Sequence, residues 1–150
     1  MQITAQPPVT ALYFSTQTTL SSLAEHISTV AQLLYAECLR LQLWPAGPIH
    51  WIYYEADGNP QTVFMLEIAL PVDGTPNGET AFPVKQLPAF TCAVTEHRGN
   101  WAELGKTYGS FVPQVLHAGH KLNGQTRELY INIDFNQPEN NITQVQVGVE

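Results

Sequence analysis

The stretch Gly47–Val72, GPIHWIYYEADGNPQTVFMLEIALPV, decides the fold because it predicts two antiparallel strands joined by a turn. An aromatic, β-branched run comes first, turn-forming residues follow, and a second apolar run closes the unit. The same pattern recurs at Gly124–Val149, GQTRELYINIDFNQPENNITQVQVGV, where Tyr130 occupies the position of Tyr53. An internal repeat of this kind predicts two similar halves.

A helix is expected upstream of each hairpin. In the first half, apolar residues recur at intervals of three and four from Leu20 to Leu41, which predicts one amphipathic helix opening at Thr18 or Thr19. In the second half, Asn100 is expected to cap a helix that Pro113 should kink or whose regular part Pro113 should end. The apolar positions of the first helix are Leu20, Leu23, Ile27, Val30, Ala31, Leu34, Cys38 and Leu41.

Strands are expected before both helices, so each half reads as strand, helix, strand, strand. The fold class is therefore α+β, with one antiparallel sheet. Residues 73–82, DGTPNGETAF, are rich in turn formers and predict a linker between the halves. We expect a single domain over residues 1–150, with repeat one at 1–72 and repeat two at 83–150.

Composition limits the classes of partner. The chain of 150 residues is 44% hydrophobic and 13% charged, which indicates an ordinary globular protein. Its net charge is −7 and it has six Lys and Arg residues, which argues against a direct nucleic-acid partner. The acidic balance favours a cationic small molecule or a basic protein surface instead.

Location signals are also weak. The first residues, MQITAQPPVTALYF, lack a basic region followed by an apolar core, and no apolar run is long enough to span a membrane. We therefore expect a cytoplasmic protein with no membrane partner. Cys38 and Cys92 stand in no recognisable motif, which predicts buried free thiols.

The second half contains two distinctive segments, EHRGNWAELGKTYGSF, preceded by LPAF, and RELYINIDFNQPENNITQVQVGV. They resemble the GyrI-like small-molecule-binding family, whose domain also forms the effector-binding part of some AraC-type activators. The most specific part is His97-Arg98-Gly99 followed by Leu104-Gly105 and Tyr108.

The resemblance implies two βαββ repeats related by a pseudo-twofold axis, with a ligand groove between their helices. It implies ligands that are often lipophilic cations, held by aromatic residues and a carboxylate. Family members include sensors, a gyrase-inhibiting protein and hydrolases of strained-ring toxins. The family pattern has Glu where Gln144 stands and Pro where Gly148 stands.

The departure at Gln144 moves the predicted carboxylate to Glu67, which lies in the matching strand of the first half. Its neighbours on the same side of the strand, Met65 and Ala69, are apolar, and a carboxylate in such a setting needs a cation or hydrogen-bond donors. A bound cation would supply that partner. The alternative is a solvated polar residue on the wet face of an antiparallel sheet.

Aromatic residues are the second predicted component of the site. Tyr53 and Tyr130 occupy equivalent places, so a twofold axis would turn both toward one cleft. Aromatic faces attract cations, and tyrosine hydroxyls orient polar groups. The predicted ligand-binding residues are Glu67, Tyr53, Tyr130, Trp51, Trp101 and Tyr108.

The sequence predicts a stand-alone domain that binds an amphipathic cation, with no catalytic residues, cofactor or metal. Two alternatives stay open. One is a hydrolase that opens strained electrophilic rings through Glu67. The other is a protein-interaction module, like a gyrase inhibitor, whose partner is another protein or a second copy of the chain.

Overall fold

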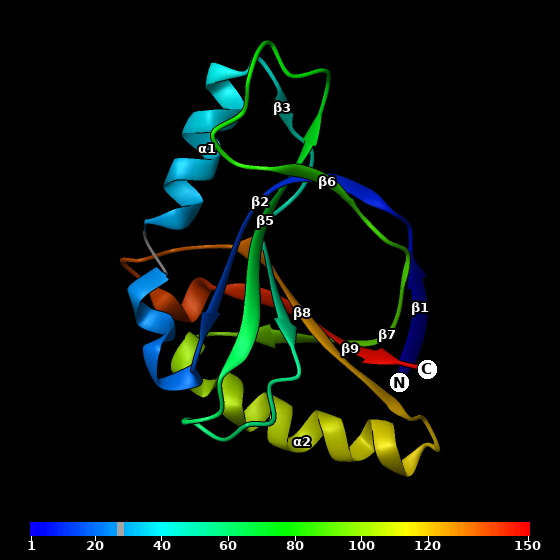
Figure 1. The fold of residues 1–150 in the computed structure, drawn as a ribbon. Helices are drawn as coiled ribbons and strands as arrows, with labels where there is room; N and C mark the ends of the chain where they lie inside the picture. Colours follow the sequence, from blue (N-terminus) through cyan, green and yellow to red (C-terminus); the bar gives the residue numbers. More distant parts are fainter. Residues whose placement is uncertain (27–28) are drawn as a thin grey trace.

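The computed structural model describes residues 1–26 and 29–150. One curved antiparallel sheet carries two main helices, α1 and α2, with short 3-10 turns between elements (Figure 1). The first half contains β1 (Gln2–Gln6), β2 (Val9–Thr18), a 3-10 helix (Leu20–His26), α1 (Val30–Arg40), β3 (Trp44–Pro45), β4 (His50–Tyr54) and β5 (Phe64–Asp73). The second half contains β6 (Val84–Leu87), β7 (Phe90–Arg98), a 3-10 turn (Trp101–Glu103), α2 (Leu104–His117), β8 (Leu122–Asn132), a 3-10 turn (Pro138–Asn140) and β9 (Ile142–Val149).

The strands follow the order β1-β7-β9-β8-β4-β5-β2-β6, and β3 adds to β5. The hairpins β4–β5 and β8–β9 meet at the centre through β4 and β8, where Trp51 pairs with Glu128. Short breaks at Pro7-Pro8 and Pro88-Ala89 divide the long N-terminal strand of each half into two pieces, since proline removes a backbone donor and favours a bend. The predicted fold class and the two related repeats are confirmed.

The sheet has two distinct faces. The face covered by α1 and α2, here called the helix face, holds two apolar clusters. One packs α1 onto β2, β4 and β5 through residues such as Leu34, and the other packs α2 onto β7 and β9 through Val115. The opposite face holds a smaller cluster around Ile52. Side chains of the central strands are thus enclosed on both sides.

The N-terminal helix differs from its predicted form. Strand β2 runs on to Thr18, which pairs with Phe64, so the predicted helix start at Thr18 is wrong. The helical part is divided into the 3-10 helix Leu20–His26 and α1. Threonine-rich sequence at 16–19 suits an extended strand better than a helix interior. The predicted core position Ile27 lies outside the described residues.

Other local predictions hold. Asn100 caps the start of the second helical segment, since its side-chain oxygen accepts a hydrogen bond from the Ala102 amide at 2.9 Å. Helix α2 continues through Pro113 to His117, so the helix does not end at Pro113, one of the two outcomes expected there. Cys38 and Cys92 are both buried free thiols. Within the described residues, no helix has the length and apolar character to cross a membrane.

Candidate functional site

The register of the two central strands decides which side chains share the helix face. Successive side chains of a strand alternate between faces, and directly paired residues point to the same side. Trp51 pairs with Glu128, so Tyr53 and Tyr130, each two residues further along its strand, lie on that side as well. The pseudo-twofold arrangement therefore brings the two equivalent tyrosines to one place, as the sequence predicts.

A buried carboxylate, Glu128, lies at the centre of this group. It is 3% exposed. Its Oε1 accepts hydrogen bonds from the hydroxyls of Tyr53 at 2.9 Å and Tyr130 at 2.6 Å. Its Oε2 accepts one from Tyr108 of α2 at 2.6 Å. Three phenols from three elements thus converge on one acid.

The Glu128 carboxylate is met by three phenol donors, and the buried His97 nearby adds an electrostatic contribution that opposes the rise of its pKa. Among the ion pairs of the described residues, none includes Glu128. Burial raises the pKa of Glu128, and the hydrogen bonds from Tyr108, Tyr130 and Tyr53 oppose that rise. Burial, together with the neighbouring carboxylate, holds the pKa of each of these phenols well above its usual value, so they remain donors.

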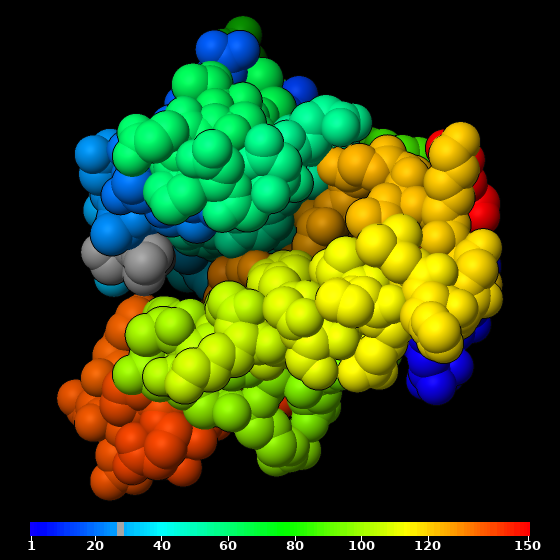
Figure 2. Space-filling view, turned by 90° about the horizontal axis from the view of Figure 1, so that it is seen from below, coloured from blue at the N-terminus to red at the C-terminus, as the bar shows by residue number. Residues whose placement is uncertain are grey.

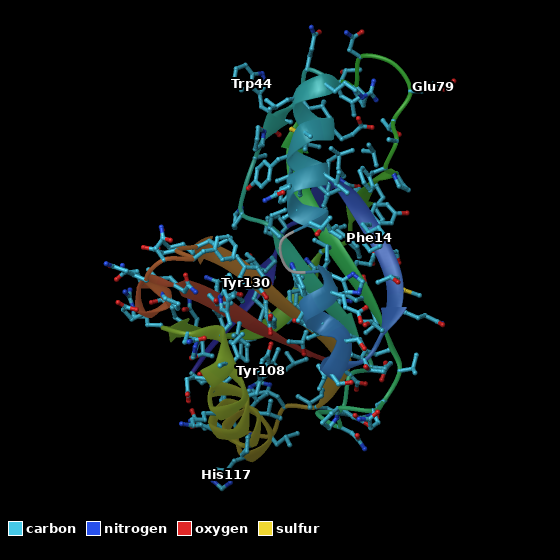
Figure 3. The ribbon with its side chains drawn as sticks, turned by 90° about the vertical axis from the view of Figure 1, so that its left-hand side faces the viewer. Phe14, Trp44, Glu79, Tyr108, His117 and Tyr130 are labelled. Atoms are coloured by element: carbon cyan, nitrogen blue, oxygen red, sulfur yellow. The ribbon has the colours of Figure 1, made fainter. Side chains whose placement is uncertain are left out.

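Two tryptophans complete the walls. Trp101 meets the Tyr130 ring edge-on, with centroids 5.4 Å apart, and its Nε1 donates to Thr143 Oγ1 at 3.2 Å. Trp51 meets the other side of Tyr130 with centroids 6.0 Å apart. Figure 3 shows Tyr130 of β8 next to Tyr108 of α2, far from Trp44 at the other end of the molecule. Edge-to-face contacts of this kind fix ring orientation.

The His97-Arg98-Gly99 motif anchors the helix that carries Tyr108. His97 is buried at the end of β7. Its Nε2 donates to the Asn100 carbonyl at 2.9 Å, and its Nδ1 lies 2.7 Å from the Thr107 hydroxyl. Thr107 immediately precedes Tyr108, so the motif fixes the first turns of α2 against the sheet. Its role is to position a site residue.

The molecular surface is hollowed between the two halves. In Figure 2, α2 crosses the molecule in yellow-green to yellow, and the residues joining β4 to β5 lie above it in teal to green. Orange atoms of β8 are visible at the floor of the hollow between them. Strand β8, which carries Glu128 and Tyr130, therefore lies at the boundary between the two halves.

Glu67, the predicted counter-ion, lies elsewhere. It pairs with Ile52 in the sheet, whereas the adjacent Tyr53 pairs with Leu66. Glu67 therefore points to the face opposite the helices, where it forms an ion pair with Lys85 and accepts a hydrogen bond from Tyr54. The structure brings Tyr53, Tyr130, Trp51, Trp101 and Tyr108 together and leaves Glu67 apart from them. In the proposal below, Glu128 takes the counter-ion role predicted for Glu67.

Sequence reasoning missed Glu128, although a signal was available. Glu128 precedes Tyr130 by two residues, so a strand places both on one face. Gln144, which stands where the family pattern has Glu, pairs with Leu129 and lies on the opposite face, where its side chain accepts a hydrogen bond from Gln146. The substitution at this position therefore leaves the tyrosine-bound acid intact.

The pair of Glu67 and Lys85 has a structural role that can be tested. Glu67 is 4% exposed, and the ammonium of Lys85 also lies 4.3 Å from the centre of the Tyr13 ring. Lys85→Ala would leave a buried carboxylate with only the Tyr54 hydroxyl as partner, so we expect a loss of about 1–2 kcal/mol in unfolding free energy. Urea denaturation of both single variants and of the double variant with Glu67→Gln measures their coupling. A loss in the double variant equal to the sum of the single losses would contradict the pairing.

Comparison with known proteins supports a family assignment. The model of a family described as Cass2, integron-associated effector binding protein, matches residues 2–147. Comparison with curated proteins gives no match.

Solved structures share the fold at low sequence identity. EcmrR in a cryo-EM complex with DNA is 18% identical with a TM-score of 0.81, and the match covers 99% of this chain and 56% of that one. The chain thus spans little more than half of EcmrR. The isolated C-terminal domain of EcmrR is 20% identical, with a TM-score of 0.78 and coverages of 99% and 96%.

Two further structures differ in their described roles. SAV2435 bound to tetraphenylphosphonium is 18% identical, with a TM-score of 0.66 and coverages of 99% and 93%. A hydrolase from Listeria innocua is 13% identical, with a TM-score of 0.66 and coverages of 99% and 91%. At these identities the likeness establishes the fold alone.

The GyrI-like resemblance of the helix and hairpin motifs is thus confirmed over nearly the whole chain. The chain belongs to the family of integron-associated effector-binding proteins.

Proposed function

We propose that the chain binds an amphipathic organic cation between its two halves, with Glu128 as the counter-ion and the surrounding aromatic rings as walls. The observation that carries the proposal is the buried Glu128 carboxylate, which has three phenol donors and forms no ion pair within the described residues. A cation that reached it would gain a strong interaction in a low-dielectric setting. SAV2435, which shares the fold, is bound to the organic cation tetraphenylphosphonium, and this supports the proposed class of ligand.

The aromatic rings explain why the ligand must be amphipathic. Faces of Trp and Tyr attract a diffuse positive charge, by about 0.5–2 kcal/mol per contact depending on desolvation. Small hydrated metal ions prefer several oxygen ligands instead. A single carboxylate among Tyr53, Tyr108, Tyr130, Trp51 and Trp101 suits a large organic cation better.

Calorimetric titration with tetraphenylphosphonium tests the proposal. We expect saturable binding of one cation per chain, with quenching of the fluorescence of Trp51 or Trp101. The exposed Trp44, at the far end of the molecule, supplies a background that a Trp44→Phe variant removes. A neutral analogue of similar shape, such as an alcohol derivative of tetraphenylmethane, controls for binding by the hydrophobic effect alone. Binding of the neutral compound alone would contradict the counter-ion.

The affinity should depend on pH in one direction. The cation prefers ionised Glu128, and burial raises the pKa of this group in the free protein. Cation binding should therefore weaken as the pH falls through that raised pKa, by up to about tenfold per pH unit, and level off above it. The loss should begin above about pH 4.3, the usual pKa of Glu.

Titrations from about pH 4 to about pH 8 in high salt measure this profile, because salt screens the general attraction of an acidic surface. The Glu128→Gln variant is the matched control and should show a flat profile. A sloping profile in that variant would assign the dependence to another group.

A further inference from the structure

A cavity lies beside Tyr130 of the site. It has a volume of about 360 Å³ and lies where α1 faces the end of β8. Its lining residues are Tyr35, Pro48, Tyr130, Ile131, Asn132 and Ile133. Ligand pockets generally span 300–1,000 Å³, and a cavity of about 150 Å³ is enough for benzene. The space therefore suits a group of one or two rings.

The cavity exists because β8 is longer than its partner. Strand β4 begins opposite Leu129, at His50, and the last backbone bond between the two chain segments joins the Tyr130 amide to the Ile49 carbonyl at 3.1 Å. Beyond that point β8 continues to Asn132 while the other chain turns away at Pro48. Tyr35 of α1 lies over the space that β4 leaves. The fold itself thus produces the hollow.

Tyr130 connects this cavity with the buried acid. The residue contributes to the cavity lining, and its hydroxyl donates to Glu128 at 2.6 Å. The cavity and the carboxylate therefore lie within about one tyrosine side chain of each other. The cavity lining combines polar and apolar groups, and its residues Ile131 and Ile133 are exposed to solvent in the free protein.

We propose that this cavity between Tyr35 and the end of β8 is a subsite for a second ring of the ligand, so that Tyr35 and Ile131 select extended over compact cations. The inference rests on the proposed function, because the cationic end of the same molecule lies at Glu128. Burial of Ile131 and Ile133 under the ring supplies the favourable free energy. Tyr35 offers an aromatic face at the mouth, where edge or offset stacking holds a second ring.

Two probes of equal charge separate the subsite from the acid. Benzyltrimethylammonium carries one ring, and biphenylmethyl-trimethylammonium carries a second ring in line with the first. In the wild-type protein the two-ring cation is expected to bind about tenfold more tightly, the gain that partial burial of one ring gives.

Tyr35→Ala should reduce that gain to about twofold and leave the affinity for the one-ring cation unchanged, because only stacking in the subsite is lost. Ile131→Thr keeps a β-branched strand residue, so the fold is retained, and should act in the same direction. Leu39→Ala is the matched control on the same helix: Leu39 is 71% exposed and lies outside the cavity lining, so the gain should persist.

The outcomes are distinguishable. If neither cation binds the wild-type protein, the proposed function itself fails. If both bind with equal affinity, or if Tyr35→Ala and Ile131→Thr preserve the gain, the acid still receives a cation but the subsite is refuted. Equal weakening of both probes in Tyr35→Ala would show a general effect on the site and would also refute the selective role. Circular dichroism and thermal unfolding of each variant verify that the fold is retained.

Discussion

Glu128→Gln is expected to weaken tetraphenylphosphonium binding by about 30-fold or more, which corresponds to about 2 kcal/mol. The substitution keeps the shape of the side chain and its ability to accept hydrogen bonds from Tyr53 and Tyr130. It removes the negative charge that a buried cation would meet. The loss therefore reports electrostatics and not a collapsed pocket, and calorimetry measures it directly.

The same substitution, Glu128→Gln, should not lower the stability of the ligand-free protein. Burial raises the folded-state pKa of Glu128, so the fold favours the neutral acid more than the unfolded chain does. A group with a raised folded pKa contributes stability at low pH, and that contribution is lost as the pH rises through the folded value. A permanently neutral glutamine avoids that loss, so the melting temperature of free Glu128→Gln at neutral pH should equal or exceed that of the wild type.

Glu67→Gln is the control for charge at a distance from the aromatic group. It removes the same charge, but on the face of the sheet opposite the tyrosines. Cation affinity should stay within about twofold of wild type, since Glu67 points to the other face of the sheet and its charge is already paired with Lys85. Strong loss in Glu67→Gln, with full affinity in Glu128→Gln, would return the counter-ion role to Glu67.

The second large effect concerns stability alone. A β-carbon added at Gly148 would lie 2.6 Å from the backbone carbonyl oxygen of Gln125 and would also collide with the side-chain oxygen of Asn123. These atoms belong to the irregular start of β8, where the pairing with β9 shifts between Leu122 and Thr126. Backbone atoms cannot rotate away, so Gly148→Ala should cost about 1–3 kcal/mol in unfolding free energy.

Gly109→Ala is the matched substitution. Gly109 lies in α2, and an added β-carbon there meets no atom within 4 Å. Alanine favours the helix by about 0.8–1.0 kcal/mol over glycine, so this variant should be more stable than the wild type. Urea denaturation of both variants measures whether each substitution lowers or raises the free energy of unfolding. Wild-type stability in Gly148→Ala would mean that the irregular segment adapts to the new group.

The repeat accounts for how much of the fold could be predicted. The match of Tyr53 with Tyr130 and the shared strand and turn pattern predicted two related hairpins, and the register then placed both tyrosines on one face. The first helix was harder, because an apolar spacing of three and four persists across the break between Leu20–His26 and α1. Periodicity alone does not distinguish a continuous helix from two shorter ones.

The acid of the site could not be chosen from the sequence by alternation alone. A strand pattern shows that Glu67 and Met65 share a side, and that Glu128 and Tyr130 share a side, but it does not show which side the helices cover. That choice depends on the pairing of Trp51 with Glu128 across the centre of the sheet. A carboxylate spaced two residues from a predicted aromatic wall residue was the more informative pattern.

The arrangement of the outer strands has a consequence for how such a chain can be divided. Strand β1 pairs with β7, and β6 pairs with β2, so each half lends its opening segment to its counterpart. Each half therefore lacks a strand that pairs with its own sheet. Cutting the chain at the linker would leave two fragments, each without the edge strand that the other fragment carries. The duplicated unit is therefore best regarded as a tethered pair, in which covalent connection keeps the exchange between the halves inside one molecule.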